Sequence, residues 1–333
     1  MTPSIWGERY RRVKQALARA GHRAMHAYRI RRLPCIRVAD AGLPTDVDKY
    51  WSAYTISVPE IETTEASAAY LDEVSRSYPL YFEYCGLYDS HEGETVLDYG
   101  CGPGNDLVGW LLRSTAKRVV GVDVSRRALE LARRRIALHR VKPSRVEFIL
   151  TTDGASQVPL PDASVDHVSC LGVLHHTMDP LTVLREFRRI LAPGGSVTVM
   201  VYNADSVYLH LNIAYERQVL AGDFAGLRAT EAYAALSDGG APLSRCYHSD
   251  EFLALCREAG LGGEYVGGAF SHLELEGFRK HRKTASQDPR LAQEHRDFLA
   301  ELKIDDRGFP HYRGFTAGLD GVFSLRAVES TAS

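Results

Sequence analysis

The chain has 333 residues and a nearly even charge balance, with 40 Lys and Arg against 42 Asp and Glu. This balance gives no electrostatic reason to expect a nucleic-acid partner. No apolar run approaches the roughly 20 residues that a membrane-spanning helix needs, and the first residues lack the apolar core of a secretion signal. The six cysteines form no C-x-x-C pair and no zinc-like group with histidine, so we expect reduced thiols, a cytoplasmic location and no bound metal.

The first segment of the chain is rich in arginine and repeats apolar residues at helical spacing over residues 5–32. The pattern predicts a basic amphipathic helix. Its apolar face could pack against the domain or a homodimer partner, or the helix could contact a membrane surface or dock an acidic substrate. Residues 33–66 look like an irregular crossing segment, and residues 67–82 look like a helix. The apolar face of the first helix carries Trp6, Tyr10, Val13, Leu17, Ala20, Ala24 and Tyr28.

A strand that looks buried then runs into a glycine-rich turn, Val-Leu-Asp-Tyr-Gly-Cys-Gly-Pro-Gly-Asn-Asp, at residues 96–106. Gly100 and Gly102 can adopt positive φ, and they lack the Cβ atoms that would hold a ligand away from the main chain. We expect a helix to begin near Asp106 with Asn105 as its cap. A dinucleotide fingerprint would require glycine in place of Asn105, so a nicotinamide oxidoreductase is disfavoured.

The pattern Asp98-x-Gly100-x-Gly102 resembles the first motif of the class I S-adenosylmethionine (SAM) dependent methyltransferases, and in particular the type 11, UbiE-like small-molecule enzymes. The resemblance implies that Asp98 and the glycine backbone embrace the methionine part of SAM, whose ammonium and sulfonium suit a carboxylate. It also implies an α/β, Rossmann-like fold with a mostly parallel seven-stranded sheet and helices on both faces. Several motifs in fixed order extend the resemblance over about residues 90–203.

Beyond the turn, short apolar runs alternate with helical patterns, which predicts βαβ units. Residues 118–124 form the second strand, and Asp123 lies where an acidic side chain can accept both ribose hydroxyls of an adenosine. Ser125 caps the next helix, and Asp179 with Pro180 is expected to begin a later helix at residues 181–191. After the third strand, the resemblance implies that Asp153 accepts a hydrogen bond from the adenine amino group. The predicted cofactor-binding residues are Asp98, Gly100, Cys101, Gly102, Asn105, Asp123, Val124, Asp153, Gly154 and Leu171.

The fourth and fifth strands are expected to begin near residues 165 and 196, and the carboxyl ends of strands in such a sheet form the ligand crevice. His175, His176 and Tyr202 fall there as candidate catalytic residues, since histidine titrates near neutral pH and can act as a general base. Helix capping or packing of the pocket wall is the alternative role for the two histidines. In relatives of this type the segments before the core lie over the SAM pocket. The expected lid and acceptor contacts are Trp51, Tyr54, Tyr70, Asn203 and Tyr208.

The expected organisation has four parts: a helical and lid extension at 1–74, a SAM-binding core at 75–203, a helical cap insertion at 204–248, and a completion of the core at 249–333 with a further insertion at about 271–319. The resemblance implies methyl transfer from SAM, which leaves S-adenosylhomocysteine (SAH), to an oxygen, nitrogen or carbon of the acceptor. The cap favours a small molecule or short peptide of specialised metabolism. The alternatives are an RNA or protein acceptor docked by the basic helix, and a SAM-binding partner protein without catalysis.

Overall fold

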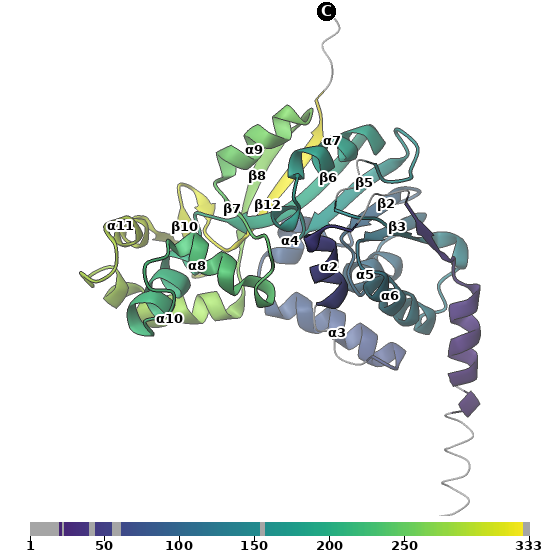
Figure 1. Ribbon diagram of the computed structural model, residues 1–333, viewed down its shortest axis with the longest axis horizontal. Helices are drawn as coiled ribbons and strands as arrows, with labels where there is room; N and C mark the ends of the chain where they lie inside the picture. The colour runs from purple at the N-terminus through teal and green to yellow at the C-terminus, as the bar shows by residue number, and fades with distance from the viewer. Residues whose placement is uncertain (1–19, 22, 40–43, 55–60, 154–156, 329–333) are drawn as a thin grey trace, which may run out of the picture.

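One mostly parallel sheet organises the computed structural model, which describes residues 20–21, 23–39, 44–54, 61–153 and 157–328. Within these residues, nine strands pair in the order β1-β4-β3-β2-β5-β6-β12-β8, with β7 beside β6 (Figure 1). Strand β12 runs antiparallel to β6 and β8, and the other pairs are parallel. The predicted fold class is confirmed, and β1 and β7 are short additions to the seven expected strands. The strands are β1 (Ile36–Val38), β2 (Thr95–Tyr99), β3 (Arg118–Asp123), β4 (Val146–Leu150), β5 (Val165–Leu171), β6 (Leu191–Asn203), β7 (Cys246–Tyr247), β8 (Leu261–Ala269) and β12 (Asp320–Ala327).

Helices cover both faces of this sheet, which explains why its central strands are apolar along their whole length rather than alternating. On one face, Trp110 and Leu129 are buried against β2 and β3. On the other face, Phe187 packs against Tyr99 of β2, and Phe252 packs against Phe323 of β12. The first face carries α5 (Asn105–Arg113) and α6 (Arg126–Leu138), and the second carries α7 (Pro180–Ile190) and α9 (Ser249–Glu258).

Two of the helices that follow strand ends begin as their cap residues predict. The Ser125 hydroxyl accepts the backbone N–H of Ala128 at the start of α6, at 3.2 Å. The Asp179 carboxylate accepts the N–H of Thr182 at the start of α7, at 3.0 Å. Helix α5 differs, because its N-cap is Gly104 in the left-handed region at φ 83°. Position 105 is therefore the first residue of α5, and the predicted cap at that position is wrong.

The segment before the core is more ordered than the sequence predicts. Residues 33–66 do not form an irregular crossing segment, because they contain β1, which pairs with β4, and the helix α2 (Asp46–Ala53). The single helix expected over 67–82 is instead two helices, α3 (Thr64–Ser77) and α4 (Tyr81–Cys85), separated at Leu80, which has φ 71°.

Residues 23–32 are helical and extend away from the body of the molecule (Figure 1). Tyr28 on this helix is 56% exposed, so its part of the predicted apolar face is not buried against the rest of the chain. The residues of the predicted amphipathic helix that precede position 20 lie outside the described part of the chain.

The insertions after β6 gather into a lobe beside the sheet, seen at the left of Figure 1. A shared apolar core holds the lobe together and includes the buried side chains of Tyr215, Phe278 and Phe298. Within the segment predicted as a helical cap insertion, 204–248, the residues Tyr208–Leu220 and Ala229–Leu236 are helical. The lobe contains the π-helix η3 (Tyr208–Leu220), α8 (Ala229–Leu236), the short η4 (Ser237–Gly239), α10 (His272–Ala285), α11 (Gln293–Glu301), and a small antiparallel sheet of β9 (Lys303–Ile304), β10 (Pro310–Tyr312) and β11 (Phe315–Thr316).

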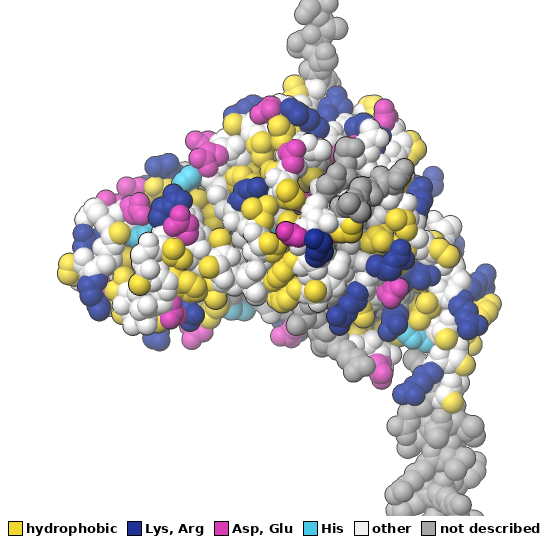
Figure 2. All heavy atoms as spheres, viewed as in Figure 1, with side chains coloured by type: hydrophobic (Ala, Val, Ile, Leu, Met, Phe, Trp, Pro, Cys, Tyr) yellow, Lys and Arg dark blue, Asp and Glu magenta, His cyan; other side chains and the backbone are white. Residues whose placement is uncertain are grey.

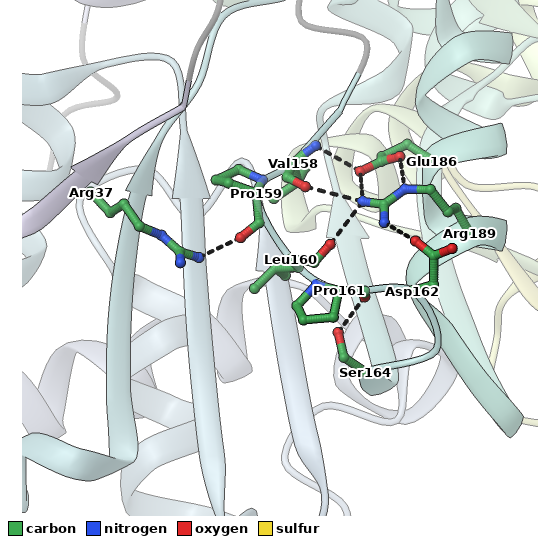
Figure 3. A network of polar contacts seen from close by, with 9 residues as sticks. All are labelled: Arg37, Val158, Pro159, Leu160, Pro161, Asp162, Ser164, Glu186 and Arg189. Carbon is green, nitrogen blue, oxygen red and sulfur yellow. Dashed lines mark hydrogen bonds and ion pairs between the residues drawn. The ribbon is translucent and has the colours of Figure 1, made fainter.

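A polar network fixes the loop that leads into β5 (Figure 3). The Arg189 guanidinium on α7 donates to the main-chain oxygens of Val158 and Leu160 at 3.1 and 3.0 Å. It also pairs with Glu186 at 2.6 Å, and the same carboxylate accepts the N–H of Val158 at 2.6 Å. Arg37 on β1 donates to the carbonyl oxygen of Pro159 at 2.6 Å. The loop is thereby tied both to α7 and to the edge of the sheet.

Candidate active site

The carboxyl ends of four parallel strands, β2 to β5, meet at one edge of the sheet and frame an open pocket of about 750 Å³. Ligands of such sheets bind at this edge, outside the carboxyl ends of the strands. Each of the four strand ends contributes a segment to the wall, and α2 contributes a fifth. The residues lining the pocket are Val47, Trp51, Tyr54, Tyr99, Gly100, Gly102, Pro103, Val122, Asp123, Val124, Ser125, Ala128, Thr151, Asp153, Gly172, Val173, His176 and Thr177.

The glycine turn forms the floor of this pocket. Gly100 and Gly102 both have positive φ, at 77° and 51°, as the sequence predicts. A Cβ atom placed on Gly102 would meet nothing within 4 Å, so the main chain there opens toward a ligand. The Asp123 carboxylate accepts the N–H of Gly102 and the N–H of Ser125, each at 2.7 Å. Burial raises the pKa of Asp123 to about 6, although these backbone hydrogen bonds act in the opposite direction.

Asp98, on β2 just before the turn, does not line the pocket itself, but its carboxylate has an oxygen without a partner among the described residues. The side chain is buried, and its Oδ2 atom has no hydrogen-bond partner among the described residues. Burial raises the pKa of Asp98 well above its ordinary value, and the neighbouring Asp106 and Asp123 raise it further. A buried carboxylate with an unused oxygen is costly unless a ligand supplies a donor or positive charge. The ammonium and sulfonium of SAM fit this requirement, whereas a pyrophosphate would be repelled.

Helix α2 lies over the pocket as a lid. The predicted lid residues Trp51 and Tyr54 line the pocket, although they lie on α2 and at its C-cap rather than in a loop. The lid is held by Asp48, whose Oδ1 accepts the N–H of Asp153 at 2.7 Å. The Asp153 carboxylate in turn accepts the N–H of Met178 at 2.9 Å. Asp153 therefore joins the lid to the loop after β5, in addition to lining the pocket.

Of the three candidate catalytic residues, His176 and Tyr202 meet at a carboxylate that the sequence analysis did not identify. The His176 Nδ1 atom lies 2.7 Å from the carbonyl oxygen of Leu243, and its Nε2 atom lies 3.1 Å from Asp238 Oδ2. The Tyr202 hydroxyl donates to the same oxygen at 2.7 Å. Burial alone would raise the pKa of Asp238, but the hydrogen bonds from His176 and Tyr202 outweigh it and lower the pKa below its ordinary value. We call Asp238, His176 and Tyr202 the acceptor-side triad.

His175, the third candidate, has a different environment. Its ring is fully buried, lies 3.7 Å from the Tyr202 ring between centroids, and has no hydrogen-bond partner for either nitrogen among the described residues. Burial lowers its pKa well below the ordinary value, and His176 lowers it further. His175 does not line the pocket, so its position matches the packing role rather than that of a base.

The remaining predicted cofactor residues divide between the pocket and its support. Val124 lines the pocket, and Gly154 lies outside the described residues. The Asn105 amide oxygen accepts from Arg135 at 3.1 Å, beneath the turn rather than in the pocket. Cys101 and Leu171 pack in the apolar core on the α5 face.

The predicted acceptor contacts outside the lid lie farther from the cofactor pocket. Tyr70 packs under the Arg135 guanidinium, with 5.3 Å from the guanidinium carbon to the ring centroid. The Asn203 amide donates to the carbonyl oxygens of Asp205 and Gly318, each at 3.0 Å, and therefore stabilises a turn. Tyr208 on η3 is half-buried against Tyr233.

Sequence reasoning missed Asp238 and Asp48. Asp238 lies in an Asp-Gly-Gly sequence that indicates only a turn, and the insertion places it 36 residues from its partner Tyr202. Its φ of 49° is in the left-handed region, which is uncommon for a residue other than glycine and is often found at functional sites. Such backbone geometry cannot be inferred from one sequence.

The comparisons with known proteins agree with this geometry. Residues 97–199 match the family model described as methyltransferase domain. An uncharacterized 37.1 kDa protein in transposon TN4556 of Streptomyces fradiae is 33% identical over 55% of this chain and 48% of its own length. A ubiquinone biosynthesis O-methyltransferase from Neisseria meningitidis is 34% identical over 41% of this chain and 57% of its own length. The chain thus spans about half the length of the curated relatives it matches.

Among solved structures, a chain from the complex between the Haloferax volcanii Trm112 methyltransferase activator and its candidate methyltransferase partner covers 86% of this chain, with 18% identity and a TM-score of 0.50. This likeness concerns the fold alone. The strand order, the glycine turn and the pocket together define a class I methyltransferase core. Residues 97–199, less than half of the chain, match the methyltransferase domain model, and this likeness supports SAM as the cofactor.

Two further findings concern the described residues only. They contain no helix that is long and apolar enough to cross a membrane. They also contain no group of three His, Cys, Asp or Glu side chains placed to hold a metal ion.

Proposed function

We propose that this protein is a SAM-dependent methyltransferase of the O-methyltransferase type that acts on a small-molecule acceptor, in biosynthesis of a specialised metabolite. The observation that carries the proposal is the direct contact between the two halves of the site, since His176 lines the cofactor pocket and also touches Asp238. SAM bound in the pocket would supply a methyl group already activated by its sulfonium. The relative named as an O-methyltransferase of ubiquinone biosynthesis supports a small acceptor.

The residues of the chain have separate tasks in this proposal. Asp98, Asp123 and the glycine turn hold SAM, while Trp51 and Tyr54 on the lid keep water away from it. Holding two reactants in attack geometry is worth roughly 7 to 11 kcal/mol of the barrier. The hydrogen bonds from His176 and Tyr202 keep Asp238 ionised and so free to accept the proton of an acceptor hydroxyl, although its lowered pKa makes it a weak base.

Transfer of label from methyl-tritiated SAM to a fractionated small-molecule extract tests the proposal. The wild-type chain should label a small molecule, and Asp238→Asn should reduce the rate by about 10²- to 10⁴-fold, the usual contribution of a general base. Asp306→Asn, at an exposed aspartate in the lobe, is the matched control and should keep the rate. Absence of labelled small molecules, or an unchanged rate in Asp238→Asn, would contradict the proposal.

A second candidate function is modification of an RNA or acidic protein, and the basic first helix favours it. Figure 2 shows Lys and Arg side chains on the side of the molecule that carries α6 and residues 23–32. Steep salt dependence of RNA binding that disappears on deletion of residues 1–32 would support this function.

Tight SAH binding without any labelled product would instead support a partner protein without catalysis. A homodimer through the same helix would appear in the molar mass in solution.

The proposed location is the cytoplasm. All six cysteines are free thiols in the structure, which fits a reducing compartment.

A further inference from the structure

Asp320, the first residue of β12, lies on the acceptor side of the site. Its side chain makes no hydrogen bond or ion pair with a described residue that would stabilise the fold. In the antiparallel register of β12 and β6, Asp320 lies directly opposite Tyr202. Directly opposed residues of an antiparallel pair project from the same face of the sheet. Asp320 therefore shares a face with Tyr202, whose hydroxyl reaches Asp238 in the acceptor-side triad.

The Asp320 carboxylate is buried but has no partner. The residue is only 9% exposed, and no hydrogen bond or ion pair joins its side chain to a described residue. Its oxygens are not among the fully enclosed atoms without a partner, so a ligand or water can reach them. The nearby charge that acts on it is negative: burial raises the pKa of Asp320 to about 7, and Asp238 raises it as well. An unpaired buried carboxylate destabilises a fold unless a ligand compensates for it.

Glu274 on α10 shows how this chain treats a buried carboxylate that has a structural role. It is 1% exposed, and it accepts the N–H of Ser271 at 2.7 Å and the N–H of Leu319 at 3.0 Å. Asp320 is next to Leu319 in the chain, yet it has no comparable donors. The difference indicates that the Asp320 carboxylate binds a ligand rather than another part of the chain.

Tyr202 lies opposite Asp320 in the strand register, and Tyr78 and Tyr81 are near enough to be affected by its charge. The charge of Asp320 contributes to raising the pKa of Tyr78 and of Tyr81, after the larger effect of burial. Tyr78, at the C-cap of α3, is 40% exposed, so this side of the site reaches solvent. Aromatic faces beside carboxylates form the environment that favours an organic ammonium, through charge pairing and cation–π attraction.

We propose that Asp320 binds the ammonium group of the acceptor, which is a small molecule carrying a basic amine, and that Tyr78, Tyr81 and Tyr202 form the walls around that group. This inference rests on the proposed function, because it assigns the acceptor of the same site. It concerns recognition, and Asp320 is the residue that selects a cationic acceptor over a neutral or anionic one.

Calorimetric titration of the SAH-saturated protein with matched pairs of probes tests this assignment. The pairs are ethylamine and ethanol, benzylamine and benzyl alcohol, and tyramine and 4-hydroxyphenethyl alcohol. We expect at least one amine to bind about tenfold more tightly than its alcohol, as a charge-assisted hydrogen bond predicts. Equal affinities within every pair, or no amine binding up to about 10 mM, would overturn the assignment.

Variants at Asp320 distinguish its charge from a general effect on the fold. Asp320→Asn and, as a second neutral variant, Asp320→Ser should abolish the preference for the amine, and SAH affinity should stay within twofold. Asp306→Asn removes an exposed carboxylate and should keep the preference. A preference that survives in either Asp320 variant would contradict the assignment. Failure of the wild-type chain to bind SAH would contradict the proposed function itself, whereas SAH binding without an amine preference would contradict only the amine site.

Discussion

The Asp123 Oδ2 atom accepts the backbone N–H of Gly102 at 2.7 Å and so ties the end of β3 to the glycine turn after β2. One carboxylate therefore both shapes the turn and faces the pocket that the turn forms. This dual role means that a change at Asp123 should affect cofactor binding through the main chain as well as through direct contact.

Asp123→Asn should weaken SAH binding by about ten- to a hundredfold, the usual effect of losing hydrogen bonds to a charged group. Calorimetric titration with SAH measures the change, and Asp306→Asn, at an exposed aspartate, is the control. Equal SAH affinity in wild type and Asp123→Asn would contradict this role.

The wild-type affinity for SAH should also depend on pH, because the pKa of Asp123 is about 6 in the folded chain. Only the ionised carboxylate can accept both ribose hydroxyls in addition to its backbone donors. Affinity should therefore fall as pH decreases through about 6 and level off above it. Titrations from pH 5 to 8 test this, and Asp123→Asn should show a flatter profile over the same range.

The lid depends on Asp48, which is 3% exposed and joins α2 to the main chain at Asp153. Asp48→Ala should lower SAH affinity about tenfold, because the lid loses its charge-assisted hydrogen bond from Asp153 and the capping-box hydrogen bond that Asp48 accepts from the N–H of Thr45. Asp46→Ala, at an exposed position on the same helix, should have little effect. Isothermal titration of the two variants side by side measures the difference, and similar affinities would show that Asp48 does not hold the lid.

His175 should make stability depend on pH. Because burial lowers its pKa well below the ordinary value, the folded chain keeps it neutral where the unfolded chain binds a proton. Stability from this group is therefore complete above about pH 7 and is lost as pH falls below about 6.5, by at most about 1.4 kcal/mol per pH unit. His175→Phe should lose less stability than wild type between pH 7 and 5 in urea unfolding. Identical pH slopes would show that His175 is protonated in the folded chain.

The Arg189 network should be a strong determinant of stability (Figure 3). Arg189→Ala leaves Glu186, which is 6% exposed, without its partner, so the free energy of unfolding should fall by about 3 kcal/mol. Arg185→Ala on the same helix breaks an exposed pair with Glu258 and should cost at most about 1 kcal/mol. Chemical unfolding compares the two, and equal losses would contradict the importance of the buried pair.

The core of the fold was predictable because its signals are local. Tyr99 at the end of the apolar run, the two positive-φ glycines and Asp123 lie near one another in the sequence, and the structure places all of them at the pocket. Ser125 and Asp179 cap helices as their sequences predict, since a cap depends on residues three positions away.

The acceptor side could not be predicted in the same way, because its residues come from distant segments. Asp238 and Tyr202 are separated by 36 residues, and Asp48 reaches the main chain of Asp153 across 105 residues. His175 and His176 are adjacent and chemically identical, yet one is buried without partners and the other lines the pocket. Only tertiary packing separates these roles.

The most direct test of the central claim is calorimetric titration of the purified chain with SAM, SAH and NAD side by side. The account predicts micromolar binding of SAM and SAH and no heat with NAD. Binding of NAD alone, or no binding of either adenosyl compound, would contradict the assignment of this pocket to SAM.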